Sequence, residues 1–568
     1  MTTTLAAGPD LFARHREKLD KAREAIRSRA YYSAFPESPS PRIYGESAAA
    51  EGKAAFEARL GKPFALDQPS TGATVATERS PYGIALGVQY PVADVDALIA
   101  SASAAVESWG AVSADARTGV ALEALARLNV PHGFEMAHAV QHTTGQAFVM
   151  AFQAGGPHAL DRALEAVAYA YEEMARVPES VVWEKPAKPE PIRVRKTYAL
   201  VPRGIDVTIG CSTFPTWNAY PGIFASLVTG NAVIVKPHPQ AVLPLAITVA
   251  IIQGVLREAG YDPRAVQLAV DTPEKPLAKV LAQRPEVALL DYTGSTEFGD
   301  WLEKNSHALV YTEKAGVNSV VIDSTDDLKG MARNLGMSLS LYSGQMCTTP
   351  QNLFVPKDGI VAGGQKISFD DVVAAVVKGV DGLLGDPERA AGVLGAIATD
   401  GTLRRIEEEN AKPGVVRKSA PVANAEFPNA RVHSPLIAVV DAADRERYDR
   451  EAFGPIAFVV RTADTDESLR LATGEAQRRG AITAIVHTTS DEVLAKAQRW
   501  ARDGKVNLAV NLTGTLLVNQ SAAFSDYHVT GGNPAGNASL TDAAFVANRF
   551  RIIETRTPVA SESAAAGA

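Results

Sequence analysis

The chain has 568 residues, of which 46% are hydrophobic and 21% are charged, and its formal net charge is −8. A chain of this length folds around more than one hydrophobic core, and its acidic balance argues against a nucleic-acid or anionic membrane surface. With only two cysteines, no apolar leader and no run of about 18 uncharged apolar residues, we expect a soluble, cytoplasmic protein without disulfides or a membrane partner.

The first part of the chain, 1–70, is predicted to be a helical extension with polar helices at roughly 10–29 and 46–60. From residue 71 onward, strand-like and helix-like stretches alternate, with apolar residues at helical spacing in the latter. The stretch at about 181–202 interrupts this pattern, because basic and apolar residues alternate along it. We expect that stretch to form an exposed β arm.

The middle of the chain is its most regular part. GIDVTIG, AVIVKP, AVQLAV and VALLDYTG read as strands, and a helical stretch follows each of the first three. This repeat predicts an α/β fold with a parallel, doubly wound sheet. A second α/β region is expected at 313–510, followed by a return segment at 511–556 and a low-complexity, disordered tail at 557–568.

Two strand ends carry residues suited to a nucleotide. Lys236 ends AVIVK, and Gly294 and Ser295 follow VALLDYT at the start of a helix. Ligands of open parallel sheets bind beyond the carboxyl ends of the strands, and a Gly-Ser turn into a helix offers N–H groups to a phosphate. The G-x-G-x-x-G fingerprint is absent from these strand ends, so the pattern favours a nucleotide without that signature.

The stretch 341–351, LYSGQMCTTPQ, places Cys347 in a small polar loop. A structural cysteine prefers apolar surroundings, whereas a reactive one needs N–H groups, partial exposure and a nearby base or cation. Glu313 in VYTEKAG offers such a base, because it follows a short apolar strand and precedes an Ala-Gly pair. Neither residue is decisive alone.

Four motifs follow one another along the chain: YTGSTEFG, TEKAG, SGQMC and EAFGP at 451–455. In this order they resemble the motifs of the aldehyde dehydrogenase superfamily. The interval of 34 residues from Glu313 to Cys347 is the one that this family keeps between its general base and its nucleophile. TGNAVIVKP is similar to the family's cofactor-side motif, and the resemblance covers about 71–555. Further stretches, including CSTFPTWNAYPG and FSDYHVTGGNPAGN, resemble the ring-cleavage semialdehyde dehydrogenases of phenylacetate degradation.

The resemblance implies a mechanism. Cys347 would attack an aldehyde as a thiolate, and Glu313 would activate the water that hydrolyses the resulting thioester. The substrate implied is a small aldehyde, which in the phenylacetate branch is the semialdehyde of a CoA thioester formed on ring opening. A homodimer or tetramer is also implied, with the arm at 181–202 contributing to subunit pairing.

The resemblance also implies how a nicotinamide cofactor is held. A cofactor-binding domain would span 71–312, the catalytic domain 313–510, and an oligomerisation segment 511–556. The implied cofactor contacts are Lys236 at the adenosine ribose, Ser295 with Gly294 at a phosphate, and Glu451 with Phe453 at the nicotinamide ribose.

Three departures from the family pattern bear on the site. Thr213 stands where the family has its asparagine donor for the oxyanion, so the Cys347 N–H or Asn218 is an alternative donor. Lys314 replaces a leucine beside the base. Pro239 replaces the acidic residue that often follows the cofactor lysine, which favours NADP, with NAD as the alternative.

Other readings stay open. His138 and His142 are spaced as zinc ligands can be, but HAVQH lacks the glutamate of the metalloprotease motif and no third ligand is evident, so no metal is expected. A CoA-acylating aldehyde dehydrogenase would transfer the acyl group to CoA instead of water. A dehydrogenase fold kept as a non-catalytic partner of other enzymes is the remaining alternative.

Overall fold

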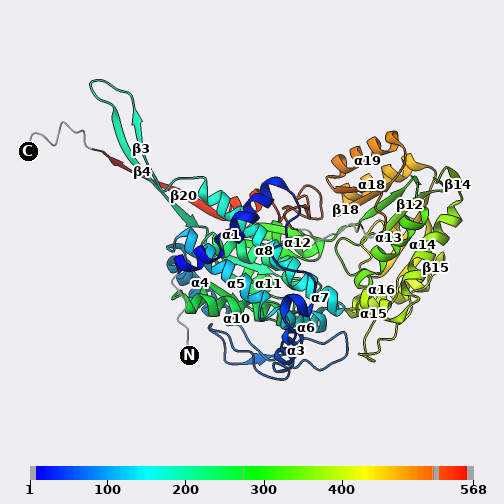
Figure 1. The fold of residues 1–568 in the computed structure, drawn as a ribbon, viewed down its shortest axis with the longest axis horizontal. Coiled ribbons are helices and arrows are strands. Elements are labelled where there is room, and N and C mark those ends of the chain that lie inside the picture. The colour runs from blue at the N-terminus through cyan, green and yellow to red at the C-terminus, as the bar shows by residue number, and fades with distance from the viewer. Residues whose placement is uncertain (1–7, 273, 515, 517–522, 560–568) are drawn as a thin grey trace, which may run out of the picture.

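A computed structural model describes residues 8–272, 274–514, 516 and 523–559. Figure 1 shows two lobes beside each other and a long arm that projects from the first. The first lobe contains the N-terminal half of the chain, and the second contains α13 (Leu328–Ser340) to α19 (Asp491–Gly504). This arrangement confirms the α/β fold class.

The N-terminal extension forms part of the first lobe. Its helix α1 (Gly8–Ser28) packs against α5 (Ala114–Asn129) and α8 (Pro157–Ala175) and shares their hydrophobic core. Between α1 and α2 (Pro41–Tyr44), residues 29–40 cross the surface as an extended strap. The strap is fixed by Phe35, which is 1% exposed, and by two hydrogen bonds from residues 33 and 34 to the carboxylate of Asp161.

The sheet of the first lobe has five parallel strands in the order β7-β6-β5-β8-β9. The chain order is β5, β6, β7, then β8 and β9 on the other side, so the sheet is doubly wound, as predicted. The switch point lies between β5 and β8. These strands are β5 (Ile205–Ile209), β6 (Ala232–Lys236), β7 (Val266–Leu268), β8 (Val287–Thr293) and β9 (Leu309–Glu313).

Helices flank this sheet and complete the lobe. They include α3 (Ala48–Glu57), α4 (Val95–Gly110), α6 (Gly133–Thr144), α7 (Phe148–Gly155), α9 (Pro215–Val228), α10 (Leu243–Glu258), α11 (Ala278–Ala282), α12 (Thr296–Asn305) and α20 (Ala543–Ala547). A short pair, β1 (Thr74–Val75) and β2 (Tyr90–Pro91), lies outside the main sheet. Among the described helices, none combines the length and the apolar character that a membrane span requires.

The second lobe is built on a seven-stranded sheet in the order β15-β16-β17-β12-β10-β18-β19, in which only β15 runs antiparallel. Two hydrophobic clusters pack against it, and both contain side chains from β10, β12 and β17. The strands are β10 (Ser319–Ile322), β12 (Asn352–Pro356), β15 (Val415–Arg417), β16 (Leu436–Asp441), β17 (Ile456–Thr462), β18 (Thr483–His487) and β19 (Asn507–Val510).

The remaining elements of this lobe are α14 (Phe369–Leu384), α15 (Pro387–Val393), α16 (Asp400–Asn410), α17 (Arg445–Tyr448), α18 (Thr465–Arg479) and a small sheet of β11 (Ser324–Thr325), β13 (Ile360–Ala362) and β14 (Gln365–Ile367).

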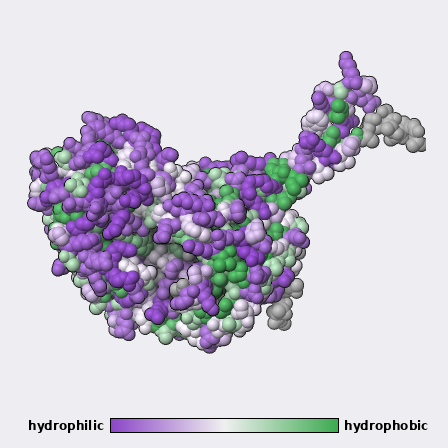
Figure 2. Space-filling view, turned by 180° about the vertical axis from the view of Figure 1, so that it is seen from behind, coloured by the Kyte–Doolittle hydropathy of each residue, from purple (hydrophilic) through white to green (hydrophobic). Residues whose placement is uncertain are grey.

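The arm is an antiparallel sheet of β3 (Ser180–Lys185), β4 (Ile192–Pro202) and β20 (Phe550–Pro558). Figure 2 shows it rising from the body with hydrophobic residues along it. The exposed apolar side chains of the arm are Val181, Val182, Trp183, Ile192, Ile552 and Ile553. The predicted tail at 557–568 begins with the last two residues of β20, and 560–568 lie outside the described residues.

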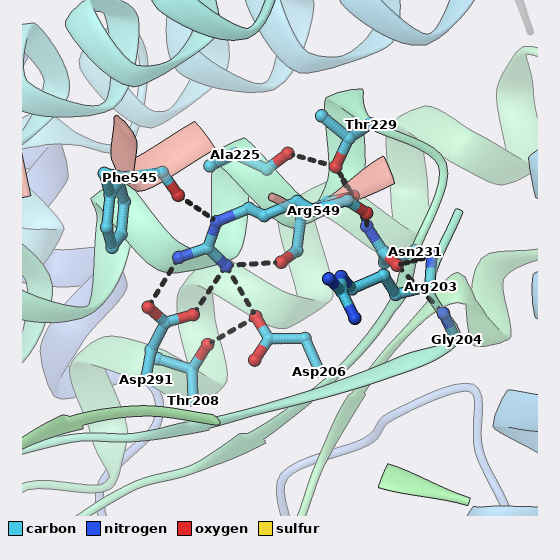
Figure 3. A network of polar contacts seen from close by, with 11 residues as sticks. Arg203, Gly204, Asp206, Thr208, Ala225, Thr229, Asn231, Asp291, Phe545 and Arg549 are labelled. Carbon is cyan, nitrogen blue, oxygen red and sulfur yellow. Dashed lines mark hydrogen bonds and ion pairs between the residues drawn. The ribbon is translucent and has the colours of Figure 1, made fainter. Parts of the chain in front are cut away.

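Arg549 ties the C-terminal segment to the first sheet (Figure 3). Its guanidinium donates two hydrogen bonds of 2.7 Å to the carboxylate of Asp291 and one to the hydroxyl of Ser226, and it lies 3.6 Å from Asp206. Asn231 adds a hydrogen bond to the carbonyl of Arg549. The side chain is fully buried, so this network fixes where β20 leaves the body and joins the arm.

Candidate active site

The loop that carries Cys347 is held in an unusual backbone conformation. Tyr342, Ser343 and Gly344 all have positive φ angles, between 50° and 65°. Non-glycine residues rarely adopt this region, and such strain persists only where the surroundings enforce it. A Cβ on Gly344 would overlap the carbonyl oxygen of Gly454, so the cysteine loop and the EAFGP loop approach each other too closely for another residue.

Asn318, just before β10, fixes the backbone on either side of the turn. Its amide donates to the carbonyl oxygens of Cys347 (2.7 Å) and Thr349 (3.0 Å), and its side-chain oxygen accepts from two N–H groups at the start of β18. No motif in the sequence indicated a role for this residue. Asn318 therefore couples the nucleophile loop to the sheet of the second lobe.

Glu313 ends β9 at the carboxyl edge of the first sheet and is only 1% exposed. Both oxygens of its carboxylate are held: Oε2 accepts from Nδ2 of Asn218 at 2.9 Å, and Oε1 accepts from Nε2 of His528 at 3.0 Å. Asn218 belongs to α9, whereas His528 comes from the return segment. The carboxylate is thus oriented by residues far away in the chain.

The structure brings Glu313 and Cys347 together, as the sequence pattern predicts. A carboxylate oxygen of Glu313, the sulfur of Cys347 and a ring nitrogen of His528 all lie within 4.8 Å of one another. The sulfur is 3.8 Å from Nε2 of His528. His528 belongs to the stretch FSDYHVTGGNPAGN, and no spacing in the sequence connects it with Cys347 or Glu313.

Electrostatics at Cys347 oppose ionisation. Burial, and next the neighbouring charge and hydrogen bond of Glu313, raise the pKa of the thiol well above its usual range. Cys211, the second cysteine, lies nearby; its thiol donates to Oδ1 of Asn218 at 3.5 Å, and burial raises its pKa as well. A thiolate at residue 347 therefore requires compensation from neighbouring groups.

Cys347 lies between two cavities. One, of about 210 Å³, is lined mainly by apolar side chains, among them Met150, Phe214, Trp217, Leu341 and Met346, with Asn218 and His528 near the sulfur. Glu37 of the strap also lines this cavity and lies 2.8 Å from a ring nitrogen of His158. The sulfur is accessible to a substrate from this side.

The second cavity, of about 20 Å³, shares Cys347 with the first and is also lined by Gly316, Asn318, Glu451, Phe453 and Gly454 among others. Burial raises the pKa of Glu451 to about 7. The carbonyl of Phe453 accepts a hydrogen bond from Arg405, which fixes the loop. A carboxylate and an aromatic residue therefore line the second cavity at the sulfur.

The carboxyl edge of the first sheet fits a dinucleotide. Its register aligns Ile209 with Lys236 on one side and with Tyr292 on the other, and Gly294 follows directly after β8. Ser295 is exposed at the N-cap of α12, where its hydroxyl accepts from the N–H of Phe298. The helix N-terminus after β8, beside the switch point, is suited to a pyrophosphate, and the ammonium at the end of β6 is suited to a ribose.

Lys236 has a partner that no motif in the sequence indicated. The ammonium forms a 2.9 Å ion pair with Asp271, which follows β7, and both side chains are buried. His238, two residues on, has its pKa lowered to about 4 by burial and by the charge of Lys236. The positive charge available at this edge is therefore smaller than the sequence indicates.

Two residues singled out in the sequence make their contacts outside the lining of the cavity. Thr213 is not among the described residues that line the cavity at Cys347; its side chain hydrogen-bonds the thiol of Cys211, and its carbonyl accepts from the amide of Gln146. Lys314 turns to α12, where its ammonium pairs with Asp300 (2.9 Å) and Glu303 (3.1 Å). The charge of Lys314 is thus directed away from the sulfur and neutralised.

The histidine pair of α6 belongs to an aromatic cluster. The ring of His142 stacks on Phe56 at 5.2 Å, and His138 stacks on the same ring at 5.8 Å. Burial lowers the pKa of both, that of His142 to about 3. In the described part of the chain, the one group of three potential metal ligands is Glu313, Cys347 and His528.

Comparisons with known proteins agree with this geometry. The model of the aldehyde dehydrogenase family matches residues 83–533. The crystal structure of an NAD-dependent aldehyde dehydrogenase from Burkholderia multivorans is 55% identical, with a TM-score of 0.95, over 97% of this chain and 99% of that one.

More distant relatives share the fold. N-succinylglutamate 5-semialdehyde dehydrogenase from Paraburkholderia xenovorans is 27% identical over 80% of this chain and 86% of its own length. A 1-pyrroline-5-carboxylate dehydrogenase from Thermus, solved with bound NAD, aligns at 19% identity with a TM-score of 0.73 over 93% of this chain and 99% of that one. The family model spans well over half of the chain and includes Glu313 and Cys347. The chain is therefore an enzyme of the aldehyde dehydrogenase family.

Proposed function

We propose that this enzyme oxidises an aldehyde to a carboxylic acid through a cysteine thioester that water hydrolyses. The observation that carries the proposal is the convergence of the Cys347 sulfur and the Glu313 carboxylate where an apolar cavity meets the cofactor side. A bound nicotinamide cofactor supplies the acceptor for the hydride.

Cys347 and Glu313 have separate roles in the reaction. Cys347 adds to the carbonyl carbon, and the acyl group stays on its sulfur once the hydride has left. Glu313 then removes a proton from water, whose oxygen adds to the thioester carbon, and the sulfur is released. The oxyanion donor is Asn218 together with the N–H of Cys347, because Asn218 lines the cavity and Thr213 does not.

The test is to mix the protein, NAD or NADP, and a panel of aldehydes, and to follow the absorbance of the reduced cofactor. Product analysis with and without free CoA separates hydrolysis from acyl transfer to CoA. Formation of the free acid without CoA supports the proposal, a CoA thioester as the product favours the acylating alternative, and a flat trace with every aldehyde favours the non-catalytic one.

The lining of the cavity bears on the substrate. Among the described residues that line it there is no arginine or lysine, and apolar side chains predominate. The relative from Paraburkholderia is named for N-succinylglutamate 5-semialdehyde, whose carboxylates would need cationic partners. We therefore favour an aldehyde with an apolar segment next to its carbonyl, which suits the semialdehyde of a ring-opened CoA thioester and the resemblance to the phenylacetate-degradation protein PaaN.

The cofactor preference is a separate proposal. The sequence favoured NADP because no carboxylate follows Lys236 closely in the chain. Asp271 supplies that carboxylate from β7, and a neutral His238 offers no charge to a 2′-phosphate. On these grounds we propose NAD as the preferred cofactor, with NADP as the alternative.

The arm is proposed to pair subunits into a homodimer or tetramer, because its exposed apolar side chains lie on a narrow projection from the body. Light scattering would measure the mass of the assembly. We keep the cytoplasm as the proposed location, since both cysteines are free thiols.

A further inference from the structure

His528 occupies a position that the proposed mechanism leaves unused. Its Nε2 faces two reacting groups, with Oε1 of Glu313 at 3.0 Å and the sulfur of Cys347 at 3.8 Å. The residue is 7% exposed and lines the apolar cavity beside the sulfur. One ring nitrogen is thus shared between the nucleophile and the base.

The ring of His528 and the backbone of its segment are held by three sets of contacts. Asn507, at the start of β19, donates to the carbonyl oxygen of His528 at 2.9 Å. The indole of Trp217 from α9 meets the ring edge to face, with centroids 4.5 Å apart. Farther along the same segment, Gly536 bridges to Glu313, and the N–H of Lys314 donates to Ala535 at 2.6 Å. The loop of His528 is therefore fastened to the strand end that carries the base.

The position matters because the sulfur is in an environment that disfavours a negative charge. Lys314 is engaged by α12, and Arg162 of α8 donates to Glu165 and to the carbonyl of Asp526. Among the described side chains, Nε2 of His528 is the nitrogen within hydrogen-bond distance of the sulfur, and in the Nε2–H tautomer it donates to it. A hydrogen bond to an ionised acceptor is about twice as strong as one between neutral groups.

We propose that His528 is a third catalytic residue, which donates its Nε2–H to the sulfur of Cys347 while the thiol ionises and to Glu313 once the sulfur carries the acyl group. This inference rests on the proposed function. When the thiol ionises, the S–H bond breaks and its proton moves to Oε1 of Glu313. That oxygen is free to take the proton because the Nε2–H of His528 now donates its hydrogen bond to the sulfur. After the first half-reaction Glu313 loses that proton to water, and the N–H returns to Oε1 and orients the carboxylate toward the thioester.

The experiment compares His528→Gln with His528→Leu in the full-length protein. The two side chains are similar in size, but only glutamine keeps an N–H at the corresponding reach. His132→Asn is the control, because His132 lies at the start of α6 and pairs with Glu135 away from the site. Alkylation of Cys347 by iodoacetamide at neutral pH, located by mass spectrometry so that Cys211 is not counted, reports the thiolate without any substrate.

We expect His528→Leu to slow alkylation of Cys347 by about 10- to 100-fold, the value of one hydrogen bond to a charged group. His528→Gln restores much of the rate, and His132→Asn matches the wild type. Equal alkylation rates for the leucine and glutamine variants would overturn the inference. Because alkylation needs no aldehyde, a wild-type protein that alkylates rapidly but oxidises nothing would refute the proposed function and not the role of His528.

Discussion

Replacing Arg549 by methionine should destabilise the first lobe strongly. The guanidinium is fully buried and neutralises Asp291 and Asp206, so the variant leaves two carboxylates in the core without a cation. Breaking a buried ion pair by removing one partner costs about 3–5 kcal/mol. We therefore expect the free energy of unfolding at pH 7 to fall by this amount, as measured by urea titration followed by circular dichroism.

The pH dependence of this loss has a defined sign. In the folded protein, burial and the charge of Asp291 raise the pKa of Asp206, and the charge of Arg549 opposes them, so that Arg549→Met raises this pKa further. A carboxylate whose folded pKa is raised contributes stability below its unfolded pKa and loses it as the pH rises through the folded value. The penalty of Arg549→Met should therefore be about 2 kcal/mol smaller at pH 5.5 than at pH 7, since each pH unit is worth about 1.4 kcal/mol for one carboxyl that stays protonated.

The matched control is Arg551→Met, two residues further on in β20, where the side chain is exposed and donates only to the carbonyl of Phe550. That variant should stay within about 0.5 kcal/mol of the wild type. A penalty for Arg549→Met below about 1 kcal/mol at pH 7, or an equal penalty at both pH values, would refute the reasoning.

Three further predictions concern the site. The Glu313→Gln variant should still form the acyl enzyme, but hydrolysis of that intermediate should be slower by about 100-fold or more. The expected signs are a stoichiometric burst of reduced cofactor and an acyl adduct in the intact mass, whereas steady turnover at the wild-type rate would contradict the prediction. Asp271→Asn should raise kcat/KM with NADP relative to NAD by roughly tenfold, because it frees the ammonium of Lys236. The control is Asp262→Asn, since Asp262 is partly buried and paired with Arg264, and an unchanged ratio for Asp271→Asn rejects the idea. Glu37→Lys should lower KM for anionic aldehydes about threefold and leave neutral ones unchanged, whereas Glu46→Lys, exposed in the same extension, should change neither.

The fold was predictable where local pattern and topology agree. Short apolar strands alternating with helices imply parallel pairing, and the observed order β7-β6-β5-β8-β9 is the doubly wound solution. The packing of the N-terminal extension was not predictable, because α1 looks like a polar surface helix. Its few apolar residues, such as Leu11 and Leu19, lie on one stripe and become fully buried against α5 and α8.

The residues of the site also divide into those that the sequence predicts and those that only the structure shows. Cys347 and Glu313 are detectable because each belongs to a local motif and the two motifs are separated by an interval that the family keeps. Asn218, Asp271 and His528 come from α9, the end of β7 and the return segment, and no local spacing connects them to the residues that they contact. A short-range pattern identifies the groups that react, whereas the groups that tune them are brought together only by tertiary structure.

The N-terminal strap illustrates why this matters for function. The ring of Tyr32 lies 5.2 Å from that of Phe524, and the guanidinium of Arg29 lies 4.2 Å over the ring of Tyr527, the residue before His528. Farther along the strap, Glu37 lines the substrate cavity. One segment thus contacts the loop of His528 and contributes a side chain to the lining of the cavity at Cys347. An extension that served only assembly would have no reason to contact both, so we infer that the strap belongs to the active site.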